Sequence, residues 1–451
     1  MQQKNGSFRD PSGFVFVENK KIFRQINPCY FETYDQLKQT GVYKELIQNG
    51  ILIGHEEVKR NDEGIVLQAE KIPFVSYPYE WSFDQLKDAA LLTLKLQIQL
   101  LQKGFSLKDA SAYNIQFIGY KPIFIDTLSF EPYIQEPWVA FGQFCKHFLY
   151  PLMLMSRIDL RLNNLLKLWI DGVPTEIMDD FLPKTTKYLS LNYWLYVKLV
   201  KSTQNRAQTK KQKIKCTLSK QQLLRVLDGL TSAVNAMKPK RKSTEWENYY
   251  TFTNYTNSSF LKKENLIQDF IQEVQPKTVW DLGANDGQFS RLASQRGIIT
   301  MAFDIDPMAV EKNYLRARTE KDVNLLPLLL DLTNPSSGIG WGNCERESLQ
   351  DRGPADLGLV LALIHHLAIG NNIPFNAMAE YFSKLFSAII IEFIPKEDSK
   401  VQELLCNRKD IFEYYNQSNF ETDFERYFTI VKKTLIEESL RTLYLMKKRL
   451  N

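Results

Sequence analysis

The sequence lacks the features that would place it in several large classes of protein. It has five cysteines in 451 residues, widely separated and never in a CxxC pair. Neither a disulfide framework nor a zinc site built from cysteine pairs is therefore expected. The number and spacing of the cysteines fit a protein of the reducing cytoplasm. The first eleven residues are polar, without the apolar stretch of a signal peptide, and no apolar run approaches the ~18 residues of a membrane helix. We expect a cytoplasmic protein without a membrane span.

The chain also lacks a large excess of positive or negative charge. The 57 basic and 52 acidic residues leave a formal net charge of +5, which is small for this length and does not indicate a nucleic-acid binder. Two basic stretches, Lys201–Lys215 and Lys238–Lys242, are expected to be solvated connectors. Binding of RNA or of an acidic partner is the alternative. The length exceeds one typical core, so we expect two or three domains.

The residue pattern divides the chain into three regions. Residues 1–150 are expected to form an α+β module, and residues 151–245 a helical region with a basic linker. In residues 246–451, helices alternate with short apolar runs, which predicts an α/β domain with a mostly parallel sheet covered on both faces. The seven predicted strands are Thr278–Asp281, Ile299–Phe303, Leu326–Leu330, Leu357–Leu361, Ala388–Glu392, Phe428–Lys432 and Thr442–Met446.

Local signals predict further elements in the first 240 residues. The predicted strands are Phe14–Val17 and Lys21–Ile26, which form a hairpin, and Ile65–Ala69 and Phe74–Tyr77. The predicted helices are Tyr34–Gln48, Asp84–Leu101 and Ser219–Met237.

A loop with two glycines follows the first strand of the C-terminal region. The strand ends at Asp281, and the tight turn Gly283-Ala284-Asn285-Asp286-Gly287 leads into a predicted helix, Phe289–Arg296. An open α/β sheet presents a nucleotide-like ligand with this strand–loop–helix arrangement, because the loop lets the backbone approach the ligand. The G-x-x-x-G spacing differs from the G-x-G-x-x-G of dinucleotide-binding folds.

Acidic residues also stand at the ends of the next two strands. Asp304, followed by Ile305, comes about 20 residues after Asp281, where an acid would hold two ribose hydroxyls. Asp331, followed by Leu332, ends the third strand and is a candidate contact to an adenine amino group. A glycine loop followed by strand-end acids in this order is a much stronger signal than the loop alone.

On these residues, the region 246–451 resembles the class I S-adenosylmethionine-dependent methyltransferases. The resemblance implies a Rossmann-like seven-stranded domain that binds S-adenosylmethionine and methylates a small-molecule or macromolecular acceptor. The cofactor site it implies consists of Asp281, Gly283, Ala284, Asn285, Gly287, Asp304, Ile305, Asp331 and Leu332. More narrowly, four segments resemble the NoeA-like, nodulation-associated methyltransferase group, namely LTNPSSGIGW, ALIHHLAIGNNIP, IIIEFIPKED and RTLYLM.

Three residues are candidates for the chemistry of methyl transfer. An O or N acceptor must lie in line with the methyl group in a dry site, and it needs a proton acceptor. His365 and His366 follow the fourth strand, and either is a candidate base, with a packing or capping role as the alternative. Glu392 ends the fifth strand and either orients the substrate or is a hydrogen-bonded strand-end residue.

A second group of residues lies in the N-terminal region. Asp109 and Asn114 have the D-x-x-x-x-N spacing of a kinase catalytic loop, and Asp126 follows a short predicted hairpin. Residues 13–150 thus resemble a kinase-like fold, which implies a possible Mg²⁺ site at Asn114 and Asp126.

Two departures favour a non-catalytic module, since only Gly13 stands where a glycine-rich loop would be and Arg24 replaces the expected lysine. Phosphotransfer by this module is one alternative, and a hydrogen-bonded turn at Asp109 and Asn114 is another. For the protein as a whole, a scaffold that senses S-adenosylmethionine without chemistry is the alternative to methyl transfer.

Overall fold

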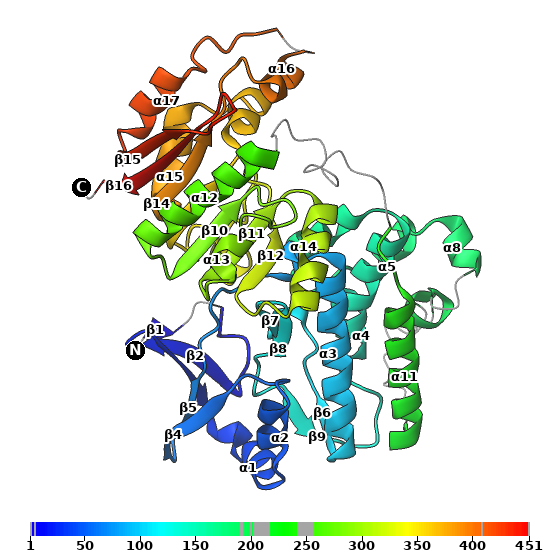
Figure 1. The fold of residues 1–451 in the computed structure, drawn as a ribbon. Helices are drawn as coiled ribbons and strands as arrows, with labels where there is room; N and C mark the ends of the chain where they lie inside the picture. The colour runs from blue at the N-terminus through cyan, green and yellow to red at the C-terminus, as the bar shows by residue number, and fades with distance from the viewer. Residues whose placement is uncertain are drawn as a thin grey trace. The chain divides into compact units, whose positions relative to one another are not determined.

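The chain folds into two compact units, each of which mixes helices and strands (Figure 1). The computed structural model describes residues 2–3, 6–189, 193–198, 201, 217–240, 257–406 and 409–449. Unit 1 comprises residues 1–242 and 338–346, and unit 2 comprises residues 243–337 and 347–451. Of the two predicted basic connectors, residues 202–215 and 241–242 lie outside the described residues. The mixed α/β class predicted from the sequence is confirmed.

Unit 1 starts with an antiparallel sheet in the order β1–β2–β3–β5–β4. Its strands are β1 (Gln2–Gln3), β2 (Gly13–Glu18), β3 (Lys21–Ile26), β4 (His55–Asn61) and β5 (Gly64–Ala69). The predicted hairpin is β2 and β3. The edge strand β4 was not predicted, because its mostly charged and exposed residues give no apolar alternation. The predicted strand at 74–77 is wrong, since the chain there is irregular.

Two short helices follow the hairpin where one was predicted. They are α1 (Phe31–Gln39) and α2 (Val42–Gln48). Gly41 separates them with a φ of 73°, a left-handed conformation that glycine adopts without steric cost and that ends a helix. Apolar spacing continues across the break, so the spacing alone predicted a single helix.

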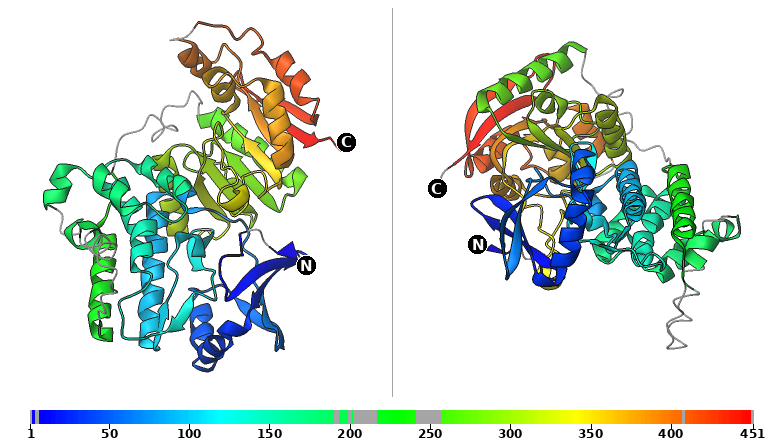
Figure 2. Two further views of the ribbon diagram at one scale, coloured as in Figure 1. Left: turned by 180° about the vertical axis from the view of Figure 1, so that it is seen from behind. Right: turned by 90° about the horizontal axis from the view of Figure 1, so that it is seen from below.

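The rest of unit 1 is mainly helical. The helix α3 (Phe83–Gln102) begins with a capping box between Ser82 and Gln85. It packs against α11 (Lys220–Ala236). Figure 2 shows these helices in two further views. Two short strand pairs are β6 (Phe105–Leu107) with β9 (Phe130–Pro132), and β7 (Ile115–Ile118) with β8 (Lys121–Phe124). In the described part of unit 1, the other α-helices are α4 (Phe141–Phe144), α5 (Tyr150–Arg157), α6 (Leu165–Leu168), α7 (Thr175–Phe181) and α8 (Lys184–Leu189).

The described part of unit 2 contains a sheet of seven strands in the order β12–β11–β10–β13–β14–β16–β15. The strands are β10 (Thr278–Leu282), β11 (Ile299–Asp304), β12 (Leu325–Leu329), β13 (Ala355–Val360), β14 (Phe386–Phe393), β15 (Phe428–Leu435) and β16 (Thr442–Lys448). The first five are parallel, and the last two are antiparallel to their neighbours. The chain order reverses between β10 and β13, and such reversals are where ligands bind in open α/β sheets.

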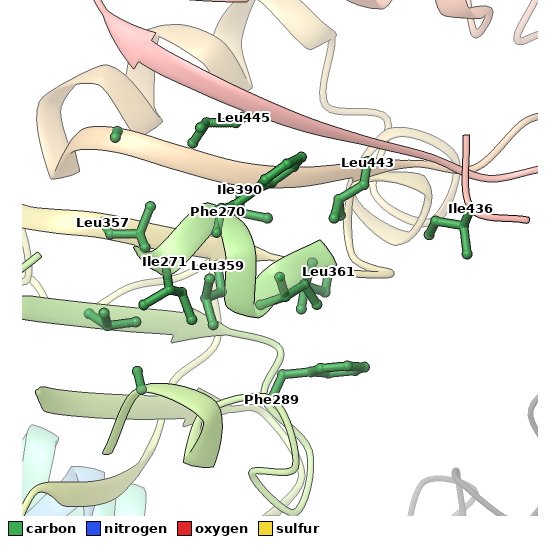
Figure 3. Close-up of a cluster of buried hydrophobic side chains, with 14 residues drawn as sticks. Phe270, Ile271, Phe289, Leu357, Leu359, Leu361, Ile390, Ile436, Leu443 and Leu445 are labelled. Atoms are coloured by element: carbon green, nitrogen blue, oxygen red, sulfur yellow. The ribbon is translucent and has the colours of Figure 1, made fainter. Parts of the chain in front are cut away.

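Helices cover both faces of this sheet. Its helices are α12 (Asn257–Val274), α13 (Arg291–Ser294), α14 (Pro307–Glu320), α15 (Phe375–Leu385), α16 (Ser399–Leu405) and α17 (Gln417–Phe424). On one face, Phe270 and Ile271 of α12 pack on Leu357, Leu359 and neighbouring strand residues (Figure 3). On the other face, aromatic rings of α15 and α17 contact β14. Alternate residues of each strand therefore face opposite layers, which fixes the face on which every strand-end side chain emerges.

None of the helices in the described part of the chain combines the length and apolar composition that a bilayer span requires.

Candidate functional site

A cavity of about 230 Å³ opens at the carboxyl ends of the parallel strands of unit 2. Eight of the nine cofactor-site residues predicted from the sequence line it, namely Asp281, Gly283, Ala284, Asn285, Asp304, Ile305, Asp331 and Leu332. The ninth, Gly287, is not among the lining residues. Segments from three different strands therefore meet at one place, as the chain order of the acids predicted.

The glycine loop takes its shape from three residues in left-handed conformations. Gly283, Asn285 and Gly287 have φ values of 77°, 50° and 78°. The amides of Gly283 and Ala284 both donate to the carbonyl oxygen of Phe303 at 2.9 Å, which ties the loop to the end of β11. A β-carbon on Gly287 would lie 2.4 Å from the side-chain amide of Asn313 on α14. Glycine is therefore required here for both conformation and space.

The helix after this loop is shorter than predicted. It begins at Arg291 rather than Phe289 and forms a single turn, α13. The Arg291 guanidinium donates to the carbonyl oxygens of Asp286 and Gly287 at 2.8 and 2.9 Å. The Ser290 hydroxyl donates a hydrogen bond to Asp281 and does not cap the helix. These side-chain bonds hold the segment before Arg291 in turns.

Asp281 is the most buried acid of the cavity. Its side chain accepts a hydrogen bond of 2.6 Å from Ser290 Oγ and is 2% exposed. Burial raises the pKa of Asp281 to about 7, and the nearby carboxylate of Asp304 adds to this effect, whereas Ser290 and Lys263 oppose it. The carboxylate thus carries its charge at a cost that a cationic ligand group would relieve.

Asp304 and Asp331 are half-buried at the ends of neighbouring strands. The oxygens of Asp304 accept hydrogen bonds from the amides of Asn285 and Asp306 at 2.7 and 2.9 Å. Burial nevertheless raises the pKa of Asp304 to about 6. Asp331 accepts from the amide and hydroxyl of Thr333 at 2.8 and 2.6 Å. Asp304 is thus held by the glycine loop and by the turn after its own strand, and Asp331 by the turn after its strand.

The two histidines have different environments. His366 lines the cavity and starts a π-helical turn, His366–Gly370, whereas His365 is 1% exposed and does not line it. Their ring centroids lie 4.1 Å apart. Burial lowers the pKa of His366 to about 4 and holds the pKa of His365 well below its ordinary value. Both rings are therefore neutral at pH 7, and only His366 reaches the cavity.

Glu392 is fully buried and does not line the cavity. It accepts hydrogen bonds from Lys263 Nζ at 2.6 Å and from the amide of Ala362 at 2.8 Å, and its other oxygen lies 3.7 Å from Arg441 Nη1. Ala362, which does line the cavity, has a φ of 48°. Glu392 thus anchors a strained residue at the end of β13, which is the contact pattern of a hydrogen-bonded strand-end residue.

The structure adds lining residues that the sequence reasoning missed, chiefly Lys263, Phe260 and Phe289. The Lys263 ammonium lies 4.7 Å from the ring centroid of Phe289, and burial lowers the pKa of Lys263 despite its ion pair with Glu392. Lys263 stands on the apolar stripe of α12, next to Phe260 and Ile267 in the 3.6-residue period. A lysine on a buried helix face was the signal in the sequence.

In unit 1, the predicted kinase-like residues also come close together. Asp109 and Asp126 are near enough for the charge of Asp126 to raise the pKa of Asp109, although burial has the larger effect. Asp126 forms an ion pair with Arg24, whose side chain is 16% exposed. Asn114 ends a short 3₁₀ turn, Ala112–Asn114, beside β7. Among the described residues, no group of three His, Cys, Asp or Glu side chains is arranged to hold a metal ion.

No protein-family model matches the chain. Several solved structures align with a part of this chain. They include the bifunctional kinase-methyltransferase WbdD, at 16% identity over 43% of this chain and 40% of that one, with a TM-score of 0.29. Magnesium protoporphyrin IX methyltransferase from Synechocystis PCC 6803 is 15% identical over 45% of this chain and 93% of its own, with a TM-score of 0.32. The N-methyltransferase NodS from Bradyrhizobium japonicum WM9 is 10% identical over 43% and 98%, with a TM-score of 0.30. Scores this low do not establish a shared fold.

The similarity to one curated protein is of a different order. The nodulation protein NoeA of Rhizobium meliloti (strain 1021) is 35% identical over 460 residues, which cover 97% of this chain and 94% of that protein. Identity at this level over nearly the full length of both proteins shows that the chain belongs to the NoeA family.

Proposed function

We propose that the protein is an S-adenosylmethionine-dependent methyltransferase whose unit 2 transfers a methyl group to an O or N acceptor. One observation carries the proposal: three strand-end acids and a glycine loop line a single cavity where the strand order reverses. The acceptor is a small molecule or a group on a macromolecule.

The residues at the cavity fit the cofactor's chemistry. In the proposal, Asp281 binds the methionine ammonium, Asp304 the ribose hydroxyls and Asp331 the adenine edge. The raised pKa of Asp281 fits this role, because a buried carboxylate that is costly to ionise gains most from a cationic partner. The cofactor, when bound, would supply an electrophilic methyl group on a sulfonium sulfur. Apolar lining residues, including Phe260, Leu363 and Leu367, would exclude water from the acceptor.

His366 is the residue that we propose as the proton acceptor. It lines the cavity, whereas His365 and Glu392 do not, and burial keeps its ring neutral at pH 7. A neutral ring nitrogen can take the proton that an O–H or N–H acceptor loses. His365 then supports the ring of His366 from the protein side, since their centroids lie 4.1 Å apart.

Cofactor binding should depend on Asp304. We expect isothermal titration calorimetry to detect S-adenosylmethionine and S-adenosylhomocysteine binding to the wild-type protein. Asp304→Ala should weaken both by about 10–100-fold, because charge-assisted hydrogen bonds contribute roughly 1.5–3 kcal/mol. Glu380→Ala, on the exposed face of α15, is the matched control and should bind normally. Absence of binding to the wild type, or unchanged binding to Asp304→Ala, would contradict the cofactor proposal.

Methyl transfer should depend on His366 more than on His365. With methyl-labelled cofactor and a cell extract as the source of acceptor, His366→Ala should lower label incorporation roughly 10²-fold, the usual contribution of a general base. Cofactor affinity should stay unchanged. Because the pKa of His366 is about 4, the wild-type rate should show no histidine inflection near pH 6.5 and should fall only toward pH 4. A wild-type rate in His366→Ala would show that it is not the base.

A scaffold that binds S-adenosylmethionine without catalysis is the alternative from another class. The same labelling experiment separates the two, because a scaffold binds the cofactor and transfers no label to any component of the extract.

A further inference from the structure

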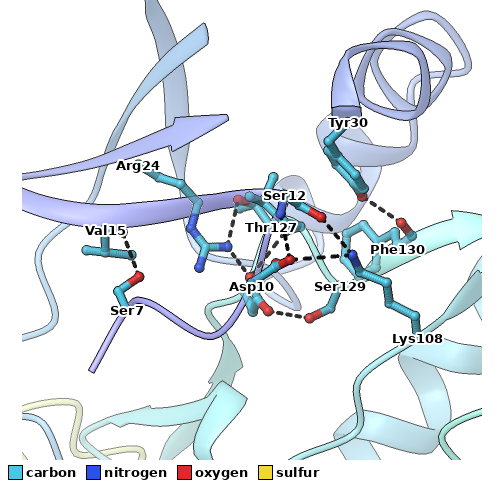
Figure 4. Close-up of polar contacts among 12 residues, drawn as sticks. Ser7, Asp10, Ser12, Val15, Arg24, Tyr30, Lys108, Thr127, Ser129 and Phe130 are labelled. Carbon is cyan, nitrogen blue, oxygen red and sulfur yellow. Dashed lines mark hydrogen bonds and ion pairs between the residues drawn. The ribbon is translucent and has the colours of Figure 1, made fainter. Parts of the chain in front are cut away.

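Arg24 of unit 1 contacts the acid that a kinase-like motif would use for a metal ion. Its Nη1 atom donates to Asp126 Oδ1, and it lies 3.5 Å from Thr127 Oγ1. Ser129 Oγ donates to the second oxygen of Asp126, and the amide of Leu128 donates to the first at 3.2 Å. Figure 4 shows Arg24 on its strand pointing toward Thr127 and Ser129. Both oxygens of Asp126 are thus engaged by protein donors.

The position of Arg24 in the sheet makes this contact rigid. Arg24 lies in β3, which is flanked by β2 and β5, and it pairs with Val15 on one side and Leu67 on the other. The Arg24 and Asp126 side chains are only 16% and 14% exposed. A guanidinium is permanently charged and presents a planar set of donors that suits a carboxylate. Burial alone would raise the pKa of Asp126, but Arg24 and Ser129 more than offset this and lower it.

The second acid of the motif is also engaged locally. Asp109 accepts a hydrogen bond of 2.9 Å from the amide of Ser111, which forms a turn of the kind that aspartate favours. A Mg²⁺ ion needs near-ideal octahedral coordination by free oxygen ligands. Asp126, which the resemblance assigns to such an ion together with Asn114, does not suit it, because the positive guanidinium of Arg24 already pairs with Asp126 Oδ1 and would repel a divalent cation there.

We propose that Arg24 is a built-in cation that stands in for a divalent metal ion at Asp126, so that unit 1 is a metal-independent module. The guanidinium neutralises Asp126 next to Asp109 without drawing an ion from solution. The proposal is independent of the methyl-transfer chemistry of unit 2.

The test is direct binding of Mn²⁺ to the full-length protein. Binding is measured as the loss of the electron paramagnetic resonance signal of the free ion. We expect wild type and Asp126→Asn to bind Mn²⁺ equally, with or without ATP, because no site at Asp126 is open. Arg24→Met should gain one bound Mn²⁺ per chain, and Arg24→Met/Asp126→Asn should lose it again. Lys108→Met is the matched control, since Lys108 pairs with Ser12 and Asp10 beside the same cluster and not with Asp126.

Two results would overturn the proposal. One is Mn²⁺ or Mn²⁺-ATP binding by the wild type that Asp126→Asn abolishes. The other is an Arg24→Met variant that is folded by circular dichroism and gains no Mn²⁺. If Arg24→Met does not fold, the comparison of wild type with Asp126→Asn decides, and Arg24→Lys, which keeps a cation at this position, should bind no additional ion.

Discussion

Asp281→Asn should stabilise the ligand-free protein at pH 8 and at the same time impair cofactor binding. Folding raises the pKa of Asp281 to about 7, so the folded state binds the proton more tightly than the unfolded state. The stability contributed by this group is therefore greatest at low pH and is lost as the pH rises from about 4 through 7. Asparagine keeps the acceptor for Ser290 and carries no charge. We expect a gain on the order of 2–4 kcal/mol at pH 8 that disappears near pH 4.

If the proposed binding mode holds, the same substitution should raise the dissociation constant of S-adenosylmethionine by about 10²-fold, because the methionine ammonium would lose its charged partner. Urea denaturation at pH 5 and pH 8 measures the stability, and calorimetry measures the affinity. Ser290→Ala is a control in which stability at pH 8 should change in the opposite direction. It removes the hydrogen bond that helps Asp281 ionise, so it should lower stability most at pH 8. Equal stability of Asp281→Asn and wild type at both pH values would show that the buried carboxylate carries no ionisation cost.

Glu392→Ala should be among the most destabilising single substitutions in unit 2. It leaves the buried Lys263 ammonium and the amide of Ala362 without their acceptor, and removing one partner of a buried ion pair costs about 3–5 kcal/mol. The free energy of unfolding from urea denaturation is the measurement. Glu380→Ala is the control, since its ion pair with Lys384 has the same type of partner but both side chains are nearly half exposed. It should cost less than about 1 kcal/mol.

A double-mutant cycle then separates the ion pair from its surroundings. Lys263→Met should cost several kcal/mol on its own, because it leaves Glu392 charged and buried with Arg441 as a more distant partner at 3.7 Å. Lys263→Met combined with Glu392→Leu should cost clearly less than the sum of the two single changes, since no unpaired charge remains. Additive costs, or a Glu392→Ala variant as stable as wild type, would show that this pair does not couple α12 to β14.

Much of unit 2 could be predicted because its signals are local. Each strand is a short apolar run, and each predicted strand in 278–446 lies within a few residues of an observed one. The predicted strands of unit 1 were less reliable where side chains did not alternate, as in β4, and where apolar spacing continued through Gly41. Prediction from the local pattern therefore succeeded for strands whose residue types are set by burial in a sheet. It failed for the exposed edge strand β4 and for the helix break that depends on the backbone angle of Gly41.

The candidate site shows the same division. The order Asp281, Asp304, Asp331 along the chain was enough to place the three acids together, because parallel strands bring their carboxyl ends to one edge of the sheet. The sequence could not tell His365 from His366, since adjacent residues differ in the direction of their side chains and only packing shows which one reaches the cavity. It also left both roles open for Glu392.

The class of the C-terminal unit, its strands and the acids at their ends could be predicted from residue type and order within short segments. The partners of the buried charges, in contrast, depend on how the folded chain packs. Lys263 meets Glu392 and Arg24 meets Asp126 across more than one hundred residues in each case. Such pairs form because helices and strands pack their buried faces together, and a charge enclosed there must find its counter-ion among whatever residues the packing brings near.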